Sequence, residues 1–569
     1  MPDAALEVPP HLRHHVVQQD YAQYDEIDQA VWRFVLLQTH ARSLRTAHPA
    51  FARGFEAAGI TVERIPRIAQ MSQRLAEHGW RAVCVDGFIP PRAFSAFQAR
   101  GVLPIAADMR TREHLAYTPA PDIIHEAAGH APFLAQPEFA RYLRRIGAVA
   151  ERAFSVKKDR EVYAAIYTLS EVKENPATTP EQLARAEQAL QAALAIEGEP
   201  SEAAKVARLY WWTVEYGLCG TPSDYRLYGA GLLSSLGEGH FCHEPRVKKL
   251  PLTAACIETD YDITREQPQL FVAESFAQLE PVLDEVTATL AQQRGGLYGL
   301  QLAQQSEELA TLTLGSGFQV CGVVSRVHAE HDAVAWVELS GECAFGRDDA
   351  ESDLPRTQGY LLPLLAVEQS FTLRDGEHID LVCAGGVQVS GRVQRVLGKP
   401  GQAGCVILDG CEIRDRERML LRSATPYPLL LGDRVLRAHA GALDGYHAST
   451  AFSGLSVPRP RSFDAAHREL LVLYERALEA WRTLGGAQLT AAFEDLTRTL
   501  DARYPDDWLL RWNLLEDLYK VGSGSLPLAD SLRTQLERLE LRFQEREPIA
   551  TGLRYLRERA TEQTKRGAA

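Results

Sequence analysis

The sequence lacks a surplus of basic residues. Its 61 lysine and arginine residues are outnumbered by 75 aspartate and glutamate residues, which gives a formal net charge of −14. An acidic chain is repelled by the phosphate backbone of nucleic acids and by anionic membrane surfaces. The longest apolar runs, such as 361–367, are far shorter than the roughly 20 residues that cross a bilayer. We therefore expect neither a nucleic-acid partner nor a membrane partner.

The sequence also lacks the marks of an exported, disulfide-rich protein. No charged segment followed by an apolar one, as in a secretory signal, occurs at its start. The nine cysteines are an odd number, and no two of them form a C-x-x-C pair. This pattern argues against a disulfide framework and against a structural zinc site. We expect reduced, buried thiols and a cytoplasmic location.

The length and composition are those of a globular protein with several domains. Of the 569 residues, 46% are hydrophobic and 24% are charged, close to the averages for soluble proteins. Helical periodicity predicts a mainly α domain over residues 1–295. Val, Gly and alternating polar and apolar residues predict a β-rich domain over 296–458, and helical periodicity returns in a C-terminal helical domain over 459–569.

The predicted β-rich domain contains an internal repeat. One set of residues recurs 69 positions later: Gly317, Gln319, Val320, Gly322, Val324, Arg326 and Val327 correspond to Gly386, Gln388, Val389, Gly391, Val393, Arg395 and Val396. We interpret this as two copies of one small β unit, packed as a pseudo-symmetric barrel or sandwich.

The predicted C-terminal helical domain follows a Pro-rich, charged linker at 456–462, which could place it away from the rest of the chain. Trp508, Trp512, Leu515 and Tyr519 form one stripe at spacings of 4, 3 and 4. Such a stripe can anchor a homo-oligomer or a protein partner. It can equally be buried within a C-terminal bundle or against the β-rich domain.

The sharpest local motif holds two histidines, His125 and His130, with Glu126 beside the first. It differs from the H-E-x-x-H zinc motif, whose histidines are four apart on one helix face. A spacing of five places them about 140° apart on an ideal α-helix, so they can share one ion only near a helix end or a distortion. Asp122 is a natural helix start, and Gly129 loosens the backbone between them. Spacing alone leaves a structural histidine pair as the commoner interpretation.

A third metal ligand would have to come from elsewhere, and Glu215 is the best candidate. It follows a Trp-Trp-Thr-Val run in a helix predicted over 201–216, where a buried acid is costly unless it is paired or metal-bound. Two histidines and one carboxylate form the facial triad of non-haem Fe(II) oxygenases. Zinc with two histidines and one glutamate is the rival choice.

Further motifs occur in order along residues 20–290. They are Met109-Arg110, Tyr117-Thr118-Pro119, His125-Glu126 with Gly129-His130, Thr213-Val214-Glu215, the run from Tyr228 to Glu238, and the run from Val272 to Phe276. This ordered set resembles the pterin-dependent aromatic amino acid hydroxylases, the family of phenylalanine, tyrosine and tryptophan hydroxylases. The resemblance covers about half of the chain. It makes the 1–295 region the expected catalytic domain of the hydroxylase fold.

The resemblance implies a cofactor set and a role for individual residues. His125, His130 and Glu215 would hold Fe(II), and a tetrahydropterin and O2 would be used to hydroxylate the ring of an aromatic amino acid. The implied catalytic residues are Glu126, Arg110 and Ser234. Those implied to bind the amino acid are Arg110, which would pair its carboxylate, with Thr118, Trp211, Gly231 and Ser234. Those implied to bind the pterin are Gly87, Phe88, Ile89, Phe94, Glu126 and Ala207.

The resemblance also suggests a substrate. Ile263 occupies a position where members that hydroxylate phenylalanine usually have an aliphatic residue and those that hydroxylate tyrosine an acid. Phenylalanine is therefore favoured, with tryptophan or tyrosine as alternatives. Two other classes remain. One is a zinc metallohydrolase with the same triad, which metal content and O2 dependence distinguish, and the other is a non-catalytic scaffold, against which the intact triad argues. Since the matched motifs end at Phe276, we expect the regions after residue 295 to take no part in the chemistry.

Overall fold

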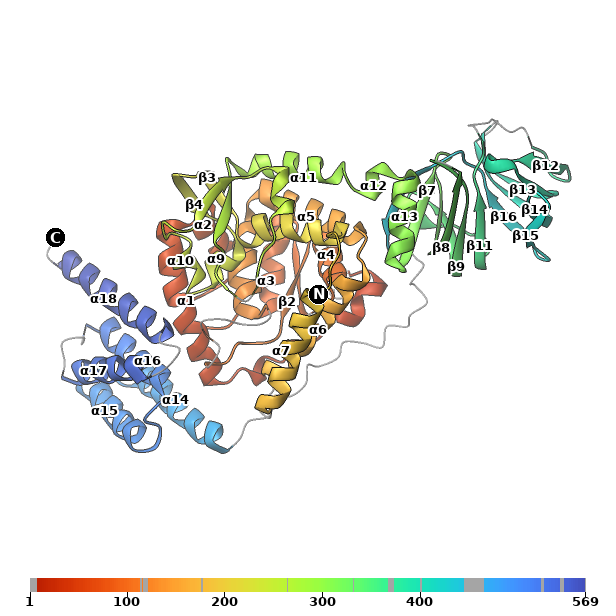
Figure 1. Ribbon diagram of the computed structural model, residues 1–569. Coiled ribbons are helices and arrows are strands. Elements are labelled where there is room, and N and C mark those ends of the chain that lie inside the picture. The colour runs from red at the N-terminus through yellow and green to blue at the C-terminus, as the bar shows by residue number, and fades with distance from the viewer. Residues whose placement is uncertain are drawn as a thin grey trace.

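In a computed structural model of the chain, a central body of helices lies between a β-rich part and a separate group of C-terminal helices (Figure 1). The structure describes residues 8–87, 89–112, 115, 121–174, 178–263, 265–330, 332–366, 373–399, 402–444, 465–522, 527–542 and 547–567. Two predicted site residues, Phe88 and Thr118, lie outside these ranges. The predicted linker at 456–462 and the predicted boundary at 458 also lie outside them.

The central body is mainly helical, as the sequence predicts. Its helices are α1 (Glu26–Thr46), α2 (Ala50–Ala57), α3 (Ile68–Leu75), α4 (Pro91–Ala99), α5 (Pro137–Arg152), α6 (Lys157–Glu174), α7 (Pro180–Leu194), α8 (Glu202–Tyr210), α9 (Ala230–Ser234), α10 (Glu238–Phe241), α11 (Leu279–Thr287) and α12 (Ala291–Arg294). Two small sheets complete it. One is the parallel pair β1 (Arg81–Val85) and β2 (Val102–Ala106), and the other has the order β4-β3-β6-β5, with β3 at Leu218–Thr221, β4 at Asp224–Leu227, β5 at Lys248–Pro251 and β6 at Gln269–Ala273.

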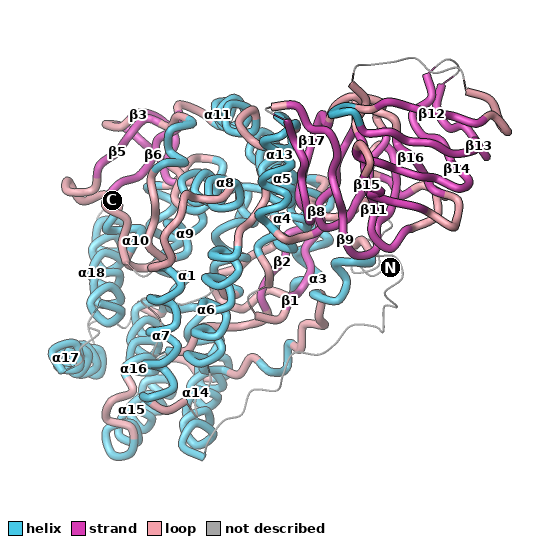
Figure 2. The backbone as a smooth tube through the Cα atoms, turned by 45° about the vertical axis from the view of Figure 1, so that its right-hand side comes forward, coloured by secondary structure: helices cyan, strands magenta, loops and turns pink. Residues whose placement is uncertain are grey.

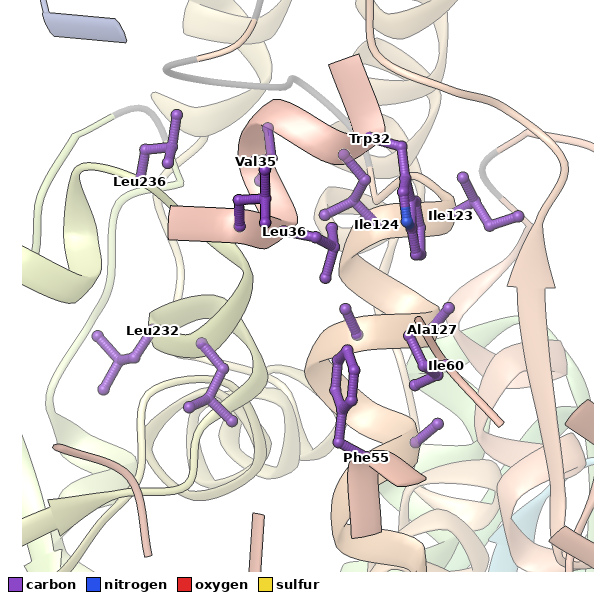
Figure 3. Close-up of a cluster of buried hydrophobic side chains, with 14 of the residues drawn as sticks. Trp32, Val35, Leu36, Phe55, Ile60, Ile123, Ile124, Ala127, Leu232 and Leu236 are labelled. Carbon is purple, nitrogen blue, oxygen red and sulfur yellow. The ribbon is translucent and has the colours of Figure 1, made fainter. Parts of the chain in front are cut away.

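Helix α1 runs through the middle of the hydrophobic core. It begins at Glu26 because the Asp25 side chain accepts the N–H groups of Ile27 and Asp28, the pattern of a capping box. Figure 3 shows Trp32 and Leu36 of α1 facing Ile124 of a second helical segment. Helix α1 is buried nearly all round, so other parts of the chain must cover its remaining faces.

The β-rich part consists of two antiparallel sheets that share one hydrophobic core (Figure 2). The first has the order β10-β9-β8-β7-β17, with β11 also paired to β9. The second has the order β12-β13-β14-β15, with β16 also paired to β14. Their bounds are β7 Leu309–Leu314, β8 Phe318–Glu330, β9 Ala333–Arg347, β10 Ala350–Glu351, β11 Thr357–Pro363, β12 His378–Val382, β13 Val387–Lys399, β14 Gln402–Asp415, β15 Arg418–Arg422, β16 Tyr427–Leu430 and β17 Val435–Ala440.

The strands of the two sheets keep a constant sequence offset. Strands β7, β8 and β9 begin 69 residues before β12, β13 and β14. The register between β8 and β9 shifts at 321/323, 324/326 and 328/329, and the register between β13 and β14 shifts at 390/392, 393/395 and 397/398. Each shift in the second pair therefore follows its counterpart at the same 69-residue offset, down to the irregular positions.

The β structure begins later than the sequence predicts. Residues after the Gly295-Gly296 pair, which have positive φ angles of 52° and 58°, first form helix α13 (Gly296–Ser306). A Cβ atom on Gly299 would lie 3.0 Å from the Cβ of Ala438 in β17, so the glycine lets α13 lie close against the sheet. The glycine pair marks a break in the chain, but the expected switch to strands at 296 is wrong because this helix is used to cover the sheet.

The C-terminal helices are α14 (Ala465–Thr483), α15 (Gly486–Arg503), α16 (Trp508–Lys520), α17 (Pro527–Arg542) and α18 (Glu547–Gly567). They pack against α1, on the side of the central body away from the β-rich part (Figure 1). The Phe34 ring of α1 makes edge contacts with Trp508 at 5.0 Å and with Trp512 at 4.7 Å between ring centroids. The predicted aromatic stripe is thus buried, and it covers α1 rather than the β-rich domain.

Two expectations from composition can be compared with the structure. All nine cysteines are buried and unpaired, as expected for reduced thiols. Among the described residues, no helix combines the length and the apolar character needed to cross a bilayer.

Candidate metal centre and surrounding site

The two histidines of the sequence motif lie on a π-helix, Ile124–His130. Hydrogen bonding from i to i+5 widens each turn, so residues five apart come to lie above one another. His125 and His130 therefore face the same side, and their Nε2 atoms are 3.1 Å apart. The distortion that their spacing demands is this π-helix, a type of element that is frequent at functional sites.

The third predicted ligand comes from a second π-helix, Trp211–Glu215, which continues directly from α8. The Glu215 carboxylate oxygens lie 3.2 Å from His125 Nε2 and 3.1 Å from His130 Nε2. This is the one group of three potential metal ligands found among the described residues. The sequence prediction of a His-His-Glu cluster is confirmed.

The separations of these atoms fit a metal ion of the expected kind. Two ligands bound at right angles through bonds of about 2.1 Å lie about 3.0 Å apart, and tetrahedral bonds of that length separate them by about 3.4 Å. The observed separations of 3.1 Å and 3.2 Å lie between these two values. A set of three protein ligands leaves other positions on such an ion for small molecules.

The electrostatics of the cluster also favour a cation. Burial by itself lowers the pKa of His125, but the Glu215 carboxylate outweighs it and raises that pKa to about 9. Burial by itself raises the pKa of Glu215, but the two imidazoles hold it well below its usual range. The carboxylate is ionised in this site, and a divalent ion can take the place of the proton that the His125 imidazole otherwise attracts.

Ser234, a predicted catalytic and substrate residue, lies behind a ligand. Its hydroxyl donates to the Ala230 carbonyl oxygen at 2.8 Å and lies 3.1 Å from His125 Nδ1. Since the hydroxyl proton is already used, its oxygen accepts from Nδ1–H, which leaves the Nε2 lone pair of His125 for a metal. The geometry makes Ser234 a residue that orients His125.

Glycines bring the two π-helices and α9 into close contact. A Cβ atom on Gly129 would lie 2.8 Å from the Ala230 carbonyl oxygen, and one on Gly229 would lie 2.4 Å from the Glu215 carbonyl oxygen. Gly231, a predicted substrate residue, is similar: its Cβ would lie 3.0 Å from the Tyr216 ring. Larger side chains would push these elements apart, so the glycines fix the positions of all three metal ligands.

Arg110, predicted to bind the substrate carboxylate, is held by Asp122. Its Nε and Nη2 donate to the two carboxylate oxygens at 2.7 Å and 2.8 Å, and both side chains are buried. Asp122 also accepts the backbone N–H of His125 at 3.1 Å. Burial by itself raises the pKa of Asp122, but the Arg110 guanidinium outweighs this effect and the pKa is lowered. One carboxylate thus links the arginine to the first metal ligand.

A stack of three aromatic rings flanks the second π-helix. Trp211, a predicted substrate residue, lies between Tyr261 at 4.2 Å and Tyr216 at 4.7 Å, measured between ring centroids. The stack fixes the plane of the indole directly after α8, four residues before Glu215. Its position forms one wall near the metal ligands.

The predicted pterin residues that the structure describes lie in one turn and on three helices. Gly87 (φ 60°) and the buried Ile89 belong to the turn between β1 and α4, and Phe94 lies on α4. The Phe94 ring approaches Tyr210 of α8 at 6.4 Å, and the exposed Ala207 lies one turn earlier on α8. Glu126 is buried on the first π-helix with a pKa raised to about 7 by burial, and its Oε2 has no hydrogen-bond partner among the described residues.

Sequence reasoning missed the roles of several residues around the site. Asp122 was identified only as a helix start, although an acid directly after a conformationally fixed proline and three residues before a histidine is well placed to hold that histidine's N–H. Gly229 and Tyr261 carried no local signal, because close backbone approach and ring stacking are tertiary contacts.

With this geometry in place, comparison with known proteins identifies the family. The model of the family "Biopterin-dependent aromatic amino acid hydroxylase" matches residues 14–171 and 176–310. The chain belongs to this family, and it is therefore a monooxygenase.

Two curated relatives show how far the similarity extends. The chain is 30% identical over 266 residues to the phenylalanine-4-hydroxylase of Chromobacterium violaceum, covering 46% of this chain and 74% of that protein. It is also 30% identical over 266 residues to the phenylalanine-4-hydroxylase of Mesorhizobium japonicum, covering 79% of that protein. A crystal structure of the C. violaceum enzyme with bound Fe(III) is 25% identical, with a TM-score of 0.38, and the match covers 51% of this chain and 94% of that one.

Proposed function

We propose that this protein uses Fe(II), a tetrahydropterin and O2 to hydroxylate the ring of an aromatic amino acid, with phenylalanine as the substrate and tyrosine as the product. The observation that carries the proposal is the His125, His130 and Glu215 set, whose ligand atoms, one from each residue, lie within 4.8 Å of one another in a chain of the biopterin-dependent hydroxylase family. Three protein ligands leave positions for O2 and solvent.

The residues of this chain hold the iron in place and exclude water from the site. His125, His130 and Glu215 would hold the iron, and the iron with the reduced pterin supplies the activation of O2. Ser234 keeps the Nε2 atom of His125 unprotonated and aimed at the metal position. The buried π-helices exclude water from one side of the site, which protects reactive species from side reactions.

The amino acid would be oriented by Arg110 and the aromatic wall. Arg110 pairs with Asp122 through Nε and Nη2, and a planar guanidinium has further N–H groups for a substrate carboxylate. Trp211, held flat by its two neighbours, would pack near the substrate ring, with Gly231 and Thr118 lining the same pocket. Gly87, Phe88, Ile89, Phe94, Glu126 and Ala207 would bind the pterin, with Phe94 stacking on its ring.

The choice of phenylalanine rests on Ile263 and on the curated phenylalanine-4-hydroxylase relatives. An aliphatic residue there suits an unsubstituted ring, whereas tyrosine would bring a hydroxyl that needs a partner.

The test is an O2-dependent assay of the purified full chain loaded with Fe(II), with tetrahydrobiopterin and each of phenylalanine, tyrosine and tryptophan. We expect tyrosine formed from phenylalanine at the highest kcat/KM, and loss of product with His130→Ala. Faster turnover of tryptophan or tyrosine would correct the substrate. Hydrolase activity with zinc and no O2 consumption with iron would overturn the proposal.

We further propose a division of the chain into a catalytic domain at 1–295, a β-rich domain at 296–458 and a C-terminal helical domain at 459–569. The 69-residue offset of strands and of register shifts supports two copies of one β unit.

We place the protein in the cytoplasm. A homo-oligomer or protein partner, if bound by the C-terminal helices, would use surfaces other than the buried aromatic stripe, and light scattering of the full chain tests self-association.

A further inference from the structure

The C-terminal helical domain reaches the segment that carries Arg110. Asp507 precedes α16 and caps it, accepting the Leu510 N–H at 3.0 Å. The same carboxylate accepts from Arg112 Nη1 at 2.6 Å, and Arg112 lies two residues after Arg110. The side chain of Asp507 is only 3% exposed and that of Arg112 is 35% exposed, so a buried carboxylate pairs with a partly exposed arginine 395 positions away.

The Arg110 segment is held firmly at its other points. The Tyr24 hydroxyl donates to the Ala107 carbonyl oxygen at 2.6 Å, and the Ile123 N–H donates to the Asp108 carbonyl oxygen at 2.9 Å. The Arg110 N–H donates to Asp122 Oδ2 at 3.1 Å. These bonds fix residues 107–110 against the central body. Asp507 holds Arg112, the next charged residue along the segment.

The buried Asp507 carboxylate depends on the positive charge of Arg112. Burial raises the pKa of Asp507, and the Arg112 guanidinium is the main group opposing that rise. The remaining groups facing Asp507 are the Leu510 N–H, the Tyr474 hydroxyl and Arg511. Removing Arg112 would leave a buried carboxylate with neutral hydrogen bonds and one cation, which is costly in a low-dielectric setting.

We propose that Asp507 is a positioning residue for the amino-acid site: through Arg112 it fixes the segment that presents Arg110, so the C-terminal helical domain completes the substrate pocket of the catalytic domain. The expected change in the KM for the amino acid rests on the proposed function. The expected fixing of the segment that carries Arg110 rests on the structure alone. It assigns to the C-terminal domain a part in substrate binding that the matched family region, which ends at residue 310, does not contain.

The experiment uses three variants of the full, iron-loaded chain: Asp507→Asn, Arg112→Gln and the double variant. Asparagine is a good helix N-cap, so Asp507→Asn keeps α16 capped while removing the charge. We expect the KM for the amino acid to rise by roughly 5- to 30-fold, as suits a lost coupling of one or two kcal/mol. The pterin KM and iron content stay unchanged. The double variant shows no further rise than either single one, because all three remove the same pair.

The matched control is Asp495→Asn. Asp495 also pairs with an arginine of the C-terminal domain, Arg476 at 3.0 Å, but it is exposed and belongs to α15. We expect this variant to have the wild-type KM. A similar rise in amino-acid and pterin KM for Asp507→Asn, or additive effects in the double variant, would overturn the proposal.

A second readout does not depend on activity. The Arg110 amide is protected by its bond to Asp122, so hydrogen exchange of a peptide spanning 103–112 reports the order of the segment. We expect faster exchange in Asp507→Asn and Arg112→Gln, and wild-type exchange in Asp495→Asn. Unchanged exchange overturns the positioning role. If exchange rises but the wild-type enzyme hydroxylates none of the three amino acids, the proposed function fails and the mechanical role stands.

Discussion

At the scale of single residues, the metal ligands depend on neighbours that do not bind the metal. His125 is held from two directions, by Ser234 at its Nδ1 and by Asp122 at its backbone N–H. Such neighbours set the tautomer and the direction of a ligand, and replacing them commonly weakens metal binding. The site should therefore be sensitive to changes that leave all three ligands in place.

Ser234→Ala tests this dependence. Without the hydroxyl, nothing holds the proton on Nδ1, and the ring of His125 can rotate or take the other tautomer. We expect the affinity for Fe(II) to fall by roughly 10- to 100-fold, measured by competition with a chelator. Ser235→Ala is the matched control, because the Ser235 hydroxyl accepts from the Glu238 N–H instead. Equal affinity in Ser234→Ala and wild type would show that packing alone orients His125.

At the scale of elements, α1 connects the metal site to the C-terminal helices. One side of α1 packs on the first π-helix (Figure 3), and Arg33 on another side forms ion pairs with Glu516 and Asp517 of α16. Glu516 is fully buried, and burial raises the pKa of Asp517 to about 6 in spite of Arg33. The helix therefore carries a buried charge cluster on the face next to its apolar contacts with the site.

Arg33→Met should destabilise the fold strongly. The variant keeps an apolar stem but leaves two buried carboxylates short of a cation, which typically costs about 3–5 kcal/mol. Urea unfolding of the full chain measures the change. The control is Arg45→Met on the same helix, whose pair with Glu558 is exposed at 52% and 47% and should contribute less than about 1 kcal/mol. Similar losses in both variants would mean that burial of the cluster is unimportant.

Helices α10 and α18 meet at a group of acids. Burial, together with Glu266 and Glu547, raises the pKa of Glu238 to about 8, although the Tyr216 hydroxyl and the Gln267 N–H oppose this. The folded protein thus keeps a proton that the unfolded chain releases at lower pH. Folding stability contributed by this group is present below its unfolded pKa and is lost as the pH rises toward about 8.

Glu238→Gln removes this titration. Its unfolding midpoint in urea should change less between pH 5.5 and pH 8.5 than that of the wild type, whose midpoint should fall over that interval. Glu274→Gln serves as the control, because Glu274 is exposed and its pH response should match that of the wild type. A fall of the same size in Glu238→Gln and wild type would contradict the argument.

Much of the element pattern could be predicted from the sequence, and the failures have physical causes. The Thr179 capping box and helix α7 after it follow local rules, so the sequence alone carries their signal. The metal site could be predicted because the ordered motifs around His125, His130 and Glu215 resemble a known family, whereas the spacing of the two histidines alone favoured a structural pair. The π-helices could only be inferred as some distortion, since their widened turns depend on packing. Helix α13 was missed because its Gly-rich sequence is a poor helix former that the sheet stabilises by contact.

At the scale of the whole molecule, the catalytic part and the C-terminal helices share one hydrophobic core, while the β-rich part has its own. The C-terminal helices therefore pack as part of the catalytic half, while the expectation that the regions after residue 295 take no part in the chemistry stays a prediction. The sequence could not show this packing, because the linker composition suggests independence and the covering of α1 is a long-range contact. The aromatic stripe is instead an internal surface of the catalytic half.

Removal of the C-terminal helices should therefore harm the catalytic part. In a chain ending at residue 444, Phe34, Arg33 and Arg112 would lose their described partners on α16 or at its cap. We expect a lower urea midpoint for the catalytic part and a loss of bound iron. Trp512→Ala in the full chain should give a smaller loss, about 3–5 kcal/mol for a buried aromatic side chain. A truncated chain with wild-type iron content and midpoint would show that α1 folds correctly when uncovered.

The position of α1 between the metal site and α16 also orders events during synthesis. The ribosome releases α1 and all three metal ligands long before α16 and α18 are made, and domains generally fold as they emerge. Until the last helices arrive, the Phe34 face of α1 is bare, so the nascent enzyme must wait for its C-terminus. We therefore expect that a chain whose translation stops before α16 contains every metal ligand but leaves the Phe34 face of α1 uncovered.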